Sequence, residues 1–180
     1  MSIAAKSRVS EAEFLTLPES LERIELIDGE VIVSPSPAFW HQEVLRRLVL
    51  VLGRWAEGRA DVTVAQAPLD VRFAPGRILQ PDAMIFLSHI GRSQTGPIDR
   101  VPEICIEVLS SNRAYDDRVT KRFIYGAAGV AEYWIVDPAG FIERWSGPGL
   151  GRDELLEERL SSPLLPGFDL EIEVLLADIK

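Results

Sequence analysis

The stretch VPEICIEVLS, residues 101–110, decides the fold class of this chain. From Glu103 to Leu109 it is a short apolar run, typical of a strand that is buried in a sheet. Glu107 lies inside this run, and burying a carboxylate is unfavourable unless a cation or strong hydrogen bonds compensate it. The segment therefore predicts a core strand and, within it, a charged site.

A second apolar run, QPDAMIF at residues 80–86, also carries one acid, Asp82. We expect a strand from Ile78 to Leu87. Side chains alternate between the two faces of a strand, so Asp82 shares a face with the residues two and four positions after it. If this strand lies beside the Glu107 strand, the two carboxylates approach each other within the span of one metal ion. Mg²⁺ suits such a site because it prefers hard oxygen ligands.

Lys121 follows the second acid, on a helix that we expect from Tyr115 to Ala128. One interpretation is a surface ion pair with Asp117, one helical turn earlier. The other is that the helix crosses the sheet and points its ammonium at the carboxylates, where it would orient water or stabilise a phosphate. Each acid taken alone also has a structural interpretation, Asp82 as a turn residue and Glu107 as the partner of an arginine. The acids and the lysine together favour a functional site.

The remaining pattern predicts strands and helices along one domain, residues 1–180. Asp28-Gly29 lies between two apolar segments and predicts a β-hairpin near the N-terminus. Helical periodicity runs from Trp40 to Trp55, and Ser10 with Glu13 forms a capping-box pattern for a short first helix. Strands before and after helices, with hairpins, indicate a mixed sheet with helices packed against it, in the α/β or α+β class.

Composition narrows the possible functions. The chain has 180 residues with 47% hydrophobic and 26% charged residues, typical of a globular protein. No apolar run has the length of a membrane span, and the single cysteine, Cys105, excludes an internal disulfide, so we expect no membrane partner and a cytoplasmic location. The net charge of −9 argues against a protein that coats DNA, because such proteins neutralise phosphates with Lys and Arg. An enzyme with a confined site remains compatible with this charge.

The sequence resembles the bacterial Uma-type restriction endonuclease family, which is part of the PD-(D/E)XK nuclease superfamily. The matching segments occur in the family's order and cover nearly the whole chain: RIELIDGE at residues 23–30, QPD at 80–82, IEVLS at 106–110, Asp117 through Lys121 to Tyr125, GVAEYWIVDP at 129–138 and SPLLPGF at 162–168. The resemblance implies a restriction endonuclease-like fold, with a central mixed β-sheet flanked by helices and an N-terminal β-hairpin.

The resemblance also implies catalytic roles in hydrolysis that depends on Mg²⁺ or Mn²⁺. Asp82 corresponds to the acid of the Pro-Asp element and Glu107 to the second acid, and both would bind the metal. Glu25 matches an N-terminal acid that completes such a site, although an outward-facing hairpin residue is an equal interpretation. The lysine expected two residues after the second acid is Leu109 here, so Lys121 on the next helix would replace it. His41 matches a family histidine, for which we expect an orienting or packing role.

Three functional hypotheses follow. The first is a metal-dependent endonuclease that hydrolyses DNA phosphodiester bonds, with Asp82, Glu107, Lys121 and Glu25 as catalytic residues and with a homodimer as a possible form. The second is a catalytically inactive interaction module of a defence or mobile-element system, which the acidic charge and Leu109 motivate. The third is hydrolysis of a different phosphate ester, which the acids alone do not exclude.

Overall fold

The computed structural model describes residues 8–18, 22–91, 94–110 and 116–178. Within these ranges the largest sheet has six strands, ordered β10 (Arg152–Leu156), β9 (Phe141–Ser146), β8 (Glu132–Asp137), β7 (Ile104–Val108), β6 (Ala83–Phe86) and β3 (Thr63–Gln66). The β7–β8 pair is parallel and the other neighbours are antiparallel, so the sheet is mixed. The predicted fold class is therefore confirmed.

The other described strands form two smaller sheets. One has four strands, ordered β2 (Glu30–Ser34), β1 (Arg23–Ile27), β5 (Arg77–Leu79) and β4 (Val71–Ala74), and the other pairs β11 (Arg159–Ser161) with β12 (Asp169–Glu171). The hairpin between β1 and β2 confirms the prediction at Asp28-Gly29. Both turn residues have positive φ, +50° and +86°, which is the conformation that a tight hairpin turn requires.

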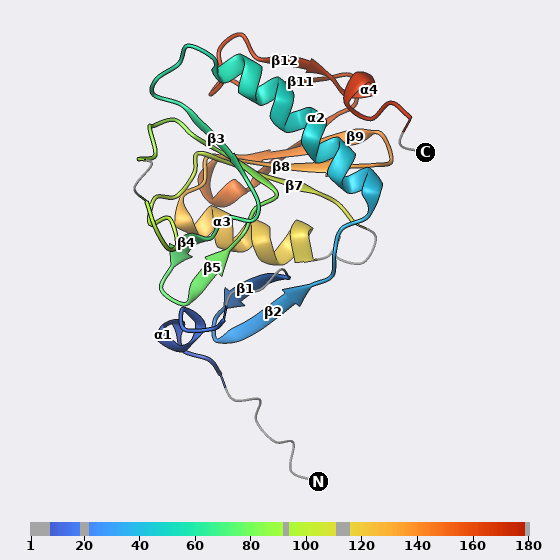
Figure 1. Ribbon diagram of the computed structural model, residues 1–180. Helices are drawn as coiled ribbons and strands as arrows, with labels where there is room; N and C mark the ends of the chain where they lie inside the picture. Colours follow the sequence, from blue (N-terminus) through green and yellow to red (C-terminus); the bar gives the residue numbers. More distant parts are fainter. Residues whose placement is uncertain (1–7, 19–21, 92–93, 111–115, 179–180) are drawn as a thin grey trace.

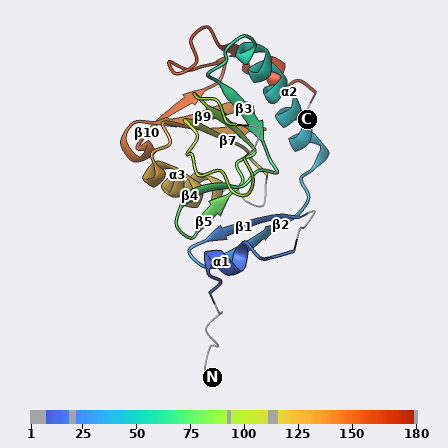
Figure 2. The same cartoon turned by 60° about the vertical axis from the view of Figure 1, so that its left-hand side comes forward.

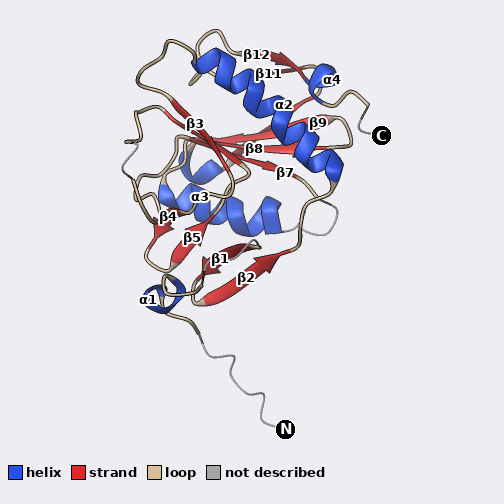
Figure 3. Ribbon diagram, viewed as in Figure 1, coloured by secondary structure: helices blue, strands red, loops and turns tan. Residues whose placement is uncertain are grey.

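Helices lie on both faces of the six-stranded sheet (Figure 1 and Figure 3). The described helices are α1 (Glu11–Phe14), α2 (Phe39–Ala56), the π-helix η1 (Asp116–Lys121), α3 (Arg122–Ala128), the 3₁₀ turn η2 (Pro148–Leu150) and α4 (Ile172–Leu175). The capping box at Ser10 and Glu13 is present at the start of α1. No described helix is long and apolar enough to span a membrane.

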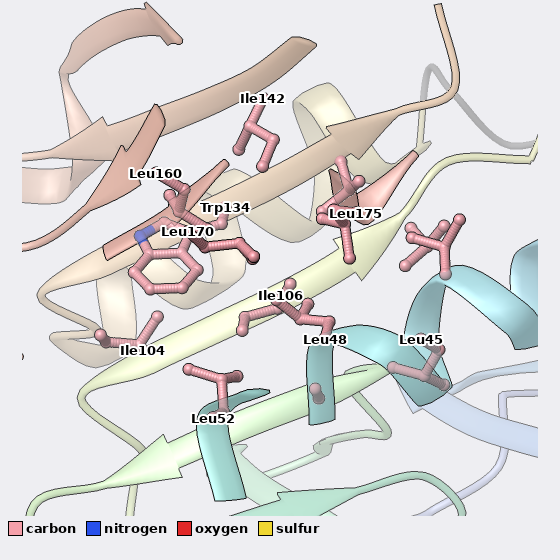
Figure 4. Close-up of a cluster of buried hydrophobic side chains, with 14 of the residues drawn as sticks. Leu45, Leu48, Leu52, Ile104, Ile106, Trp134, Ile142, Leu160, Leu170 and Leu175 are labelled. Atoms are coloured by element: carbon pink, nitrogen blue, oxygen red, sulfur yellow. The ribbon is translucent and has the colours of Figure 1, made fainter. Parts of the chain in front are cut away.

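Helix α2 covers one face of the large sheet through a helical stripe of leucines. Leu45, Leu48 and Leu52 are buried and pack in one cluster with Ile106 of β7 and Trp134 of β8 (Figure 4). Each such side chain contributes about 1.5–3 kcal/mol by leaving water. This packing fixes α2, and with it His41, against the strand that carries Glu107.

Helix α3 lies on the opposite face of the large sheet, with the four-stranded sheet beyond it (Figure 2). Tyr125 of α3 is fully buried in a second cluster with Met84, Cys105 and Tyr133 of the large sheet and Phe73 of β4. The charged site described below lies between these two sheets.

The structure corrects one predicted element. The strand expected from Ile78 to Leu87 is two strands in different sheets, because β5 ends at Leu79 and β6 begins at Ala83. Pro81 lies between them and has no N–H to donate to a sheet ladder. The start predicted for the later helix, Tyr115, lies outside the described residues, whereas its end at Gly129 is confirmed, with φ +91°.

Candidate active site

The predicted acids Asp82 and Glu107 do meet in space. Strands β6 and β7 are antiparallel neighbours, with Ala83 opposite Ile106. Asp82 precedes Ala83 and Glu107 follows Ile106, so the two acids come next to each other in this register. Glu25 comes from β1 of the other sheet. All three carboxylates are buried, with exposures of 3% for Asp82 and 1% for Glu25 and for Glu107.

Asp82 is fixed by three donors. The Val108 N–H donates to Oδ2 (2.8 Å), His41 Nε2 lies 3.1 Å from the same oxygen, and Arg23 Nη1 donates to Oδ1 (2.7 Å). Burial alone would raise the pKa of Asp82, but the hydrogen bond from His41 and the charge of Arg23 hold this pKa well below its usual value. Asp82 is therefore a carboxylate at neutral pH. His41 contacts it directly, and the orienting or packing role of His41 stays a prediction.

Lys121, the last residue of η1, reaches the same cluster. Its Nζ lies 2.9 Å from Glu107 Oε1 and 3.1 Å from Asp117 Oδ1, and its side chain is only 6% exposed. The ion pair with Asp117 exists, but it is buried rather than on the surface. Although burial opposes the charge, Glu107 and Glu25 raise the pKa of Lys121 above its ordinary value, so the ammonium stays protonated.

Glu107 differs from the other two carboxyls. Its Oε1 accepts from the Tyr125 hydroxyl (2.9 Å) as well as from Lys121. Burial, together with the negative charges of Asp82 and Asp117, raises the pKa of Glu107 to about 8 despite the two nearby cations. Glu25 has the opposite shift, because Lys121 and Arg23 outweigh its burial and lower its pKa.

Arg23 lies at the centre of this arrangement. Its guanidinium contacts Asp82 through Nη1, and its Nη2 lies 3.2 Å from Glu25 Oε1 and 3.5 Å from Glu107 Oε2. It also donates to the carbonyl oxygen of Gln80, whose N–H donates to Glu25 Oε1 (2.9 Å). The three predicted metal ligands thus surround a guanidinium.

Sequence reasoning missed Arg23 and Tyr125. Arg23 precedes Glu25 by two positions on a strand, so the two side chains share a face. Tyr125 follows Lys121 by four positions, which places both on one helical face. These spacings were available in the sequence, but they acquire meaning only when the hairpin and the helix are known to face the same carboxylates.

The cluster lies at the side of a cleft of about 540 Å³. Its lining combines polar and charged residues, Arg23, His41, Asp82, Glu107, Asp117 and Lys121, with apolar residues, Pro35, Pro37, Trp40, Leu45, Pro68 and Val108. A molecule in this cleft would contact both carboxylates and cations.

The donor set matches the chemistry of a divalent cation, because Glu25, Asp82 and Glu107 provide hard carboxylate oxygens that already surround one positive group. As arranged, however, no group of three His, Cys, Asp or Glu side chains in the described part of the chain is placed to hold a metal ion. The side chains of the site therefore have the chemistry that binds a divalent metal ion, but in this structure they are arranged around the guanidinium of Arg23.

Comparison with known proteins gives a family. The model of the Uma2 family, described as "Putative restriction endonuclease", matches residues 11–173. The crystal structure of "a putative nuclease belonging to DUF820" from Anabaena variabilis has 24% sequence identity and a TM-score of 0.80, with 96% of this chain and 99% of that chain covered. At this identity the structural likeness concerns the fold. No curated protein matches the chain.

Proposed function

Because the chain belongs to the Uma2 family, we propose that it is an endonuclease that hydrolyses phosphodiester bonds, with DNA as its substrate. The observation that supports this most is the convergence of Glu25, Asp82, Glu107 and Lys121 beside one cleft. Buried acids with a buried lysine are costly to maintain, and such groups are concentrated at functional sites. A cytoplasmic location and action as a homodimer both stay predictions.

Glu25, Asp82 and Glu107 would hold Mg²⁺ or Mn²⁺. When bound, such an ion supplies positive charge to the phosphoryl oxygens and lowers the pKa of a coordinated water. The chain's own residues position the reacting groups. His41 and the Val108 N–H fix the orientation of Asp82, and the protonated Lys121 orients the attacking water or stabilises charge on the phosphate.

Cleavage of plasmid and single-stranded DNA with Mg²⁺ or Mn²⁺ tests this function. Asp82→Asn keeps the size of the side chain and removes its charge, and we expect it to reduce the cleavage rate by roughly 100-fold or more. Lys121→Met should have an effect of the same order. Asp28→Asn is the matched control, because Asp28 pairs with Arg77 away from the cleft lining. An Asp82→Asn protein that is as active as wild type would refute the assignment.

One observation favours a second function, the catalytically inactive interaction module. Arg23 and Lys121 already form ion pairs with the acids of the cluster and His41 contacts Asp82, so the acids have partners within the fold. No cleavage by wild type with either metal, together with no metal uptake in calorimetry, would favour this function.

A further inference from the structure

The proposed function gives no role to Arg23, although this residue contacts all three carboxyl groups of the proposed metal site. It lies at the start of β1, and its guanidinium contacts Asp82, Glu25 and Glu107 at 2.7, 3.2 and 3.5 Å. An arginine on a hairpin strand would ordinarily point to solvent. Here only 21% of the side chain is exposed, and three carboxylates from two sheets converge on it.

The contacts of Arg23 have a clear electrostatic role. Negative charges on Glu25, on Asp82 and on Glu107 once it is deprotonated would repel one another in a poorly hydrated interior, and a cation between them offsets this repulsion. Lys121 pairs with Glu107 and Asp117, whereas the ion pair of Asp82 is with Arg23. A guanidinium cannot lose its proton in a protein, so Arg23 supplies this charge at any pH.

The same oxygens cannot serve Arg23 and a metal together. Mg²⁺ requires oxygen ligands at about 2.1 Å, and the guanidinium nitrogens already lie within hydrogen-bonding or ion-pair range of all three carboxylates. Two cations in this space would also repel each other. Metal entry therefore requires the guanidinium to leave.

The surroundings of Arg23 provide a place for it to go. Arg23 lines the cleft, and its Nε has no hydrogen-bond partner among the described residues although it is buried. A rotation of the side chain towards the cleft breaks the carboxylate contacts and hydrates that nitrogen. In the cleft the guanidinium would face a bound phosphodiester, which arginine binds well through paired hydrogen bonds.

We propose that Arg23 is the resident counter-ion of the carboxylate cluster, and that a divalent metal binds by displacing its guanidinium into the cleft. This inference rests on the proposed function, because that function defines the three carboxylates as metal ligands. It makes Arg23 a positioning residue that sets the affinity of the protein for metal and keeps the metal-free site folded.

The experiment measures metal binding and stability without DNA. We titrate MnCl₂ into wild type, Arg23→Met and Arg72→Met in a calorimeter, and we record thermal midpoints in EDTA and in MnCl₂. Arg72 is the matched control: its side chain is 26% exposed, close to the 21% of Arg23, and it pairs with Glu11 and Asp99 away from the cleft lining. We expect Arg23→Met to bind Mn²⁺ at least about tenfold more tightly than wild type, since a competing charge is gone.

The thermal midpoints separate displacement from a merely structural role. Arg23→Met should melt earlier than wild type in EDTA, and Mn²⁺ should restore most of this loss. Arg72→Met should melt earlier in both conditions with unchanged Mn²⁺ affinity. Three results would overturn the inference: equal Mn²⁺ affinities of Arg23→Met and wild type, an equal rise in the thermal midpoint of both variants on adding Mn²⁺, or no Mn²⁺ binding by any of the proteins.

A second measurement covers the case in which Arg23→Met does not fold. A crystal of wild type soaked in MnCl₂ should show the manganese among the three carboxylates and the Arg23 guanidinium in the cleft; a bound manganese with the guanidinium still in place would overturn the inference. Tighter Mn²⁺ binding by Arg23→Met without DNA cleavage by any of these proteins retains this inference and removes the proposed function. DNA cleavage by wild type, together with equal Mn²⁺ affinities of wild type and Arg23→Met, would retain the proposed function and remove this inference.

Discussion

Glu107 is the carboxyl whose protonation the fold changes most clearly. The cluster contains Asp82, Glu25, Glu107 and Asp117, and Glu107 has both negative neighbours and complete burial. Its pKa rises to about 8 from an ordinary 4.5. Between these values the folded protein keeps a proton on Glu107 that the unfolded chain has lost.

This difference predicts a pH dependence of stability in the metal-free protein. Unfolding releases the proton of Glu107, so raising the pH from about 5 to about 8 lowers the free energy of unfolding, by at most about 1.4 kcal/mol per pH unit. Above the folded pKa both states are deprotonated and the dependence ends. Urea unfolding of wild type and Glu107→Gln in EDTA measures it, because the variant lacks the titrating group.

The sign is opposite for Asp82, whose pKa is lowered by the fold, so its contribution is lost only as the pH falls below its ordinary value of 3.8. The two groups therefore act in separate pH ranges. Parallel pH profiles of wild type and Glu107→Gln between pH 5 and 8 would contradict the assignment to Glu107.

The sequence predicted the acids and the lysine but not their central partner. Asp82 and Glu107 stand out because an acid within an apolar run needs compensation, and Lys121 follows in the family's order. Arg23 precedes the β-hairpin turn in an ordinary alternating strand, where outward-facing arginines are common. Its role depends on how the four-stranded sheet packs on the larger one, and no local pattern contains that information.

The interruption between β5 and β6 shows how one proline shapes the site. Apolar residues flank Gln80-Pro81-Asp82 on both sides, and together they predict one strand from Ile78 to Leu87. In the structure the chain leaves one sheet at Leu79 and enters the other at Ala83. Asp82 lies at the end of this crossing, which explains why its carboxylate reaches Arg23 of one sheet and the Val108 N–H of the other.

Helix α3 depends on a glycine for its close contact with the turn η2. A Cβ atom added at Gly126 would lie 2.5 Å from the carbonyl oxygen of Gly149, which is backbone and cannot rotate away. We expect Gly126→Ala to lower the free energy of unfolding by about 1–3 kcal/mol through overpacking. Chemical denaturation measures this.

Gly53 provides the control for this prediction. It also lies within a helix, α2, but a Cβ atom there would meet nothing within 4 Å. Gly53→Ala should therefore raise stability by about 0.5–1 kcal/mol, the ordinary gain in a helix interior. If both alanines changed stability in the same direction, the contact with Gly149 would not be the cause.

The overall architecture could be predicted because its elements carry strong local signals in a recognisable order. The hairpin turn, the leucine stripe of α2 and the apolar β7 strand each gave the correct element, and the ordered motifs gave the family. The distribution of strands between two sheets could not be predicted, since it depends on contacts between segments far apart in the chain. A single domain over residues 1–180 stays a prediction.

The long connection between β6 and β7 divides the charged cluster into two sets. Arg23, Glu25 and Asp82 precede the long connection between β6 and β7, whereas Glu107 and Lys121 follow it. A polypeptide broken after the exposed His89 would therefore yield two fragments, each with an incomplete set of the proposed catalytic groups.

We expect neither fragment alone to cleave DNA. Co-expression should restore activity by complementation, because β6 and β7 pair across the break. Purification through a tag on one fragment, followed by a cleavage assay, measures this, and an active single fragment would contradict it. Reassembly of this ion network could then serve as a reporter of the association of two proteins fused to the fragments.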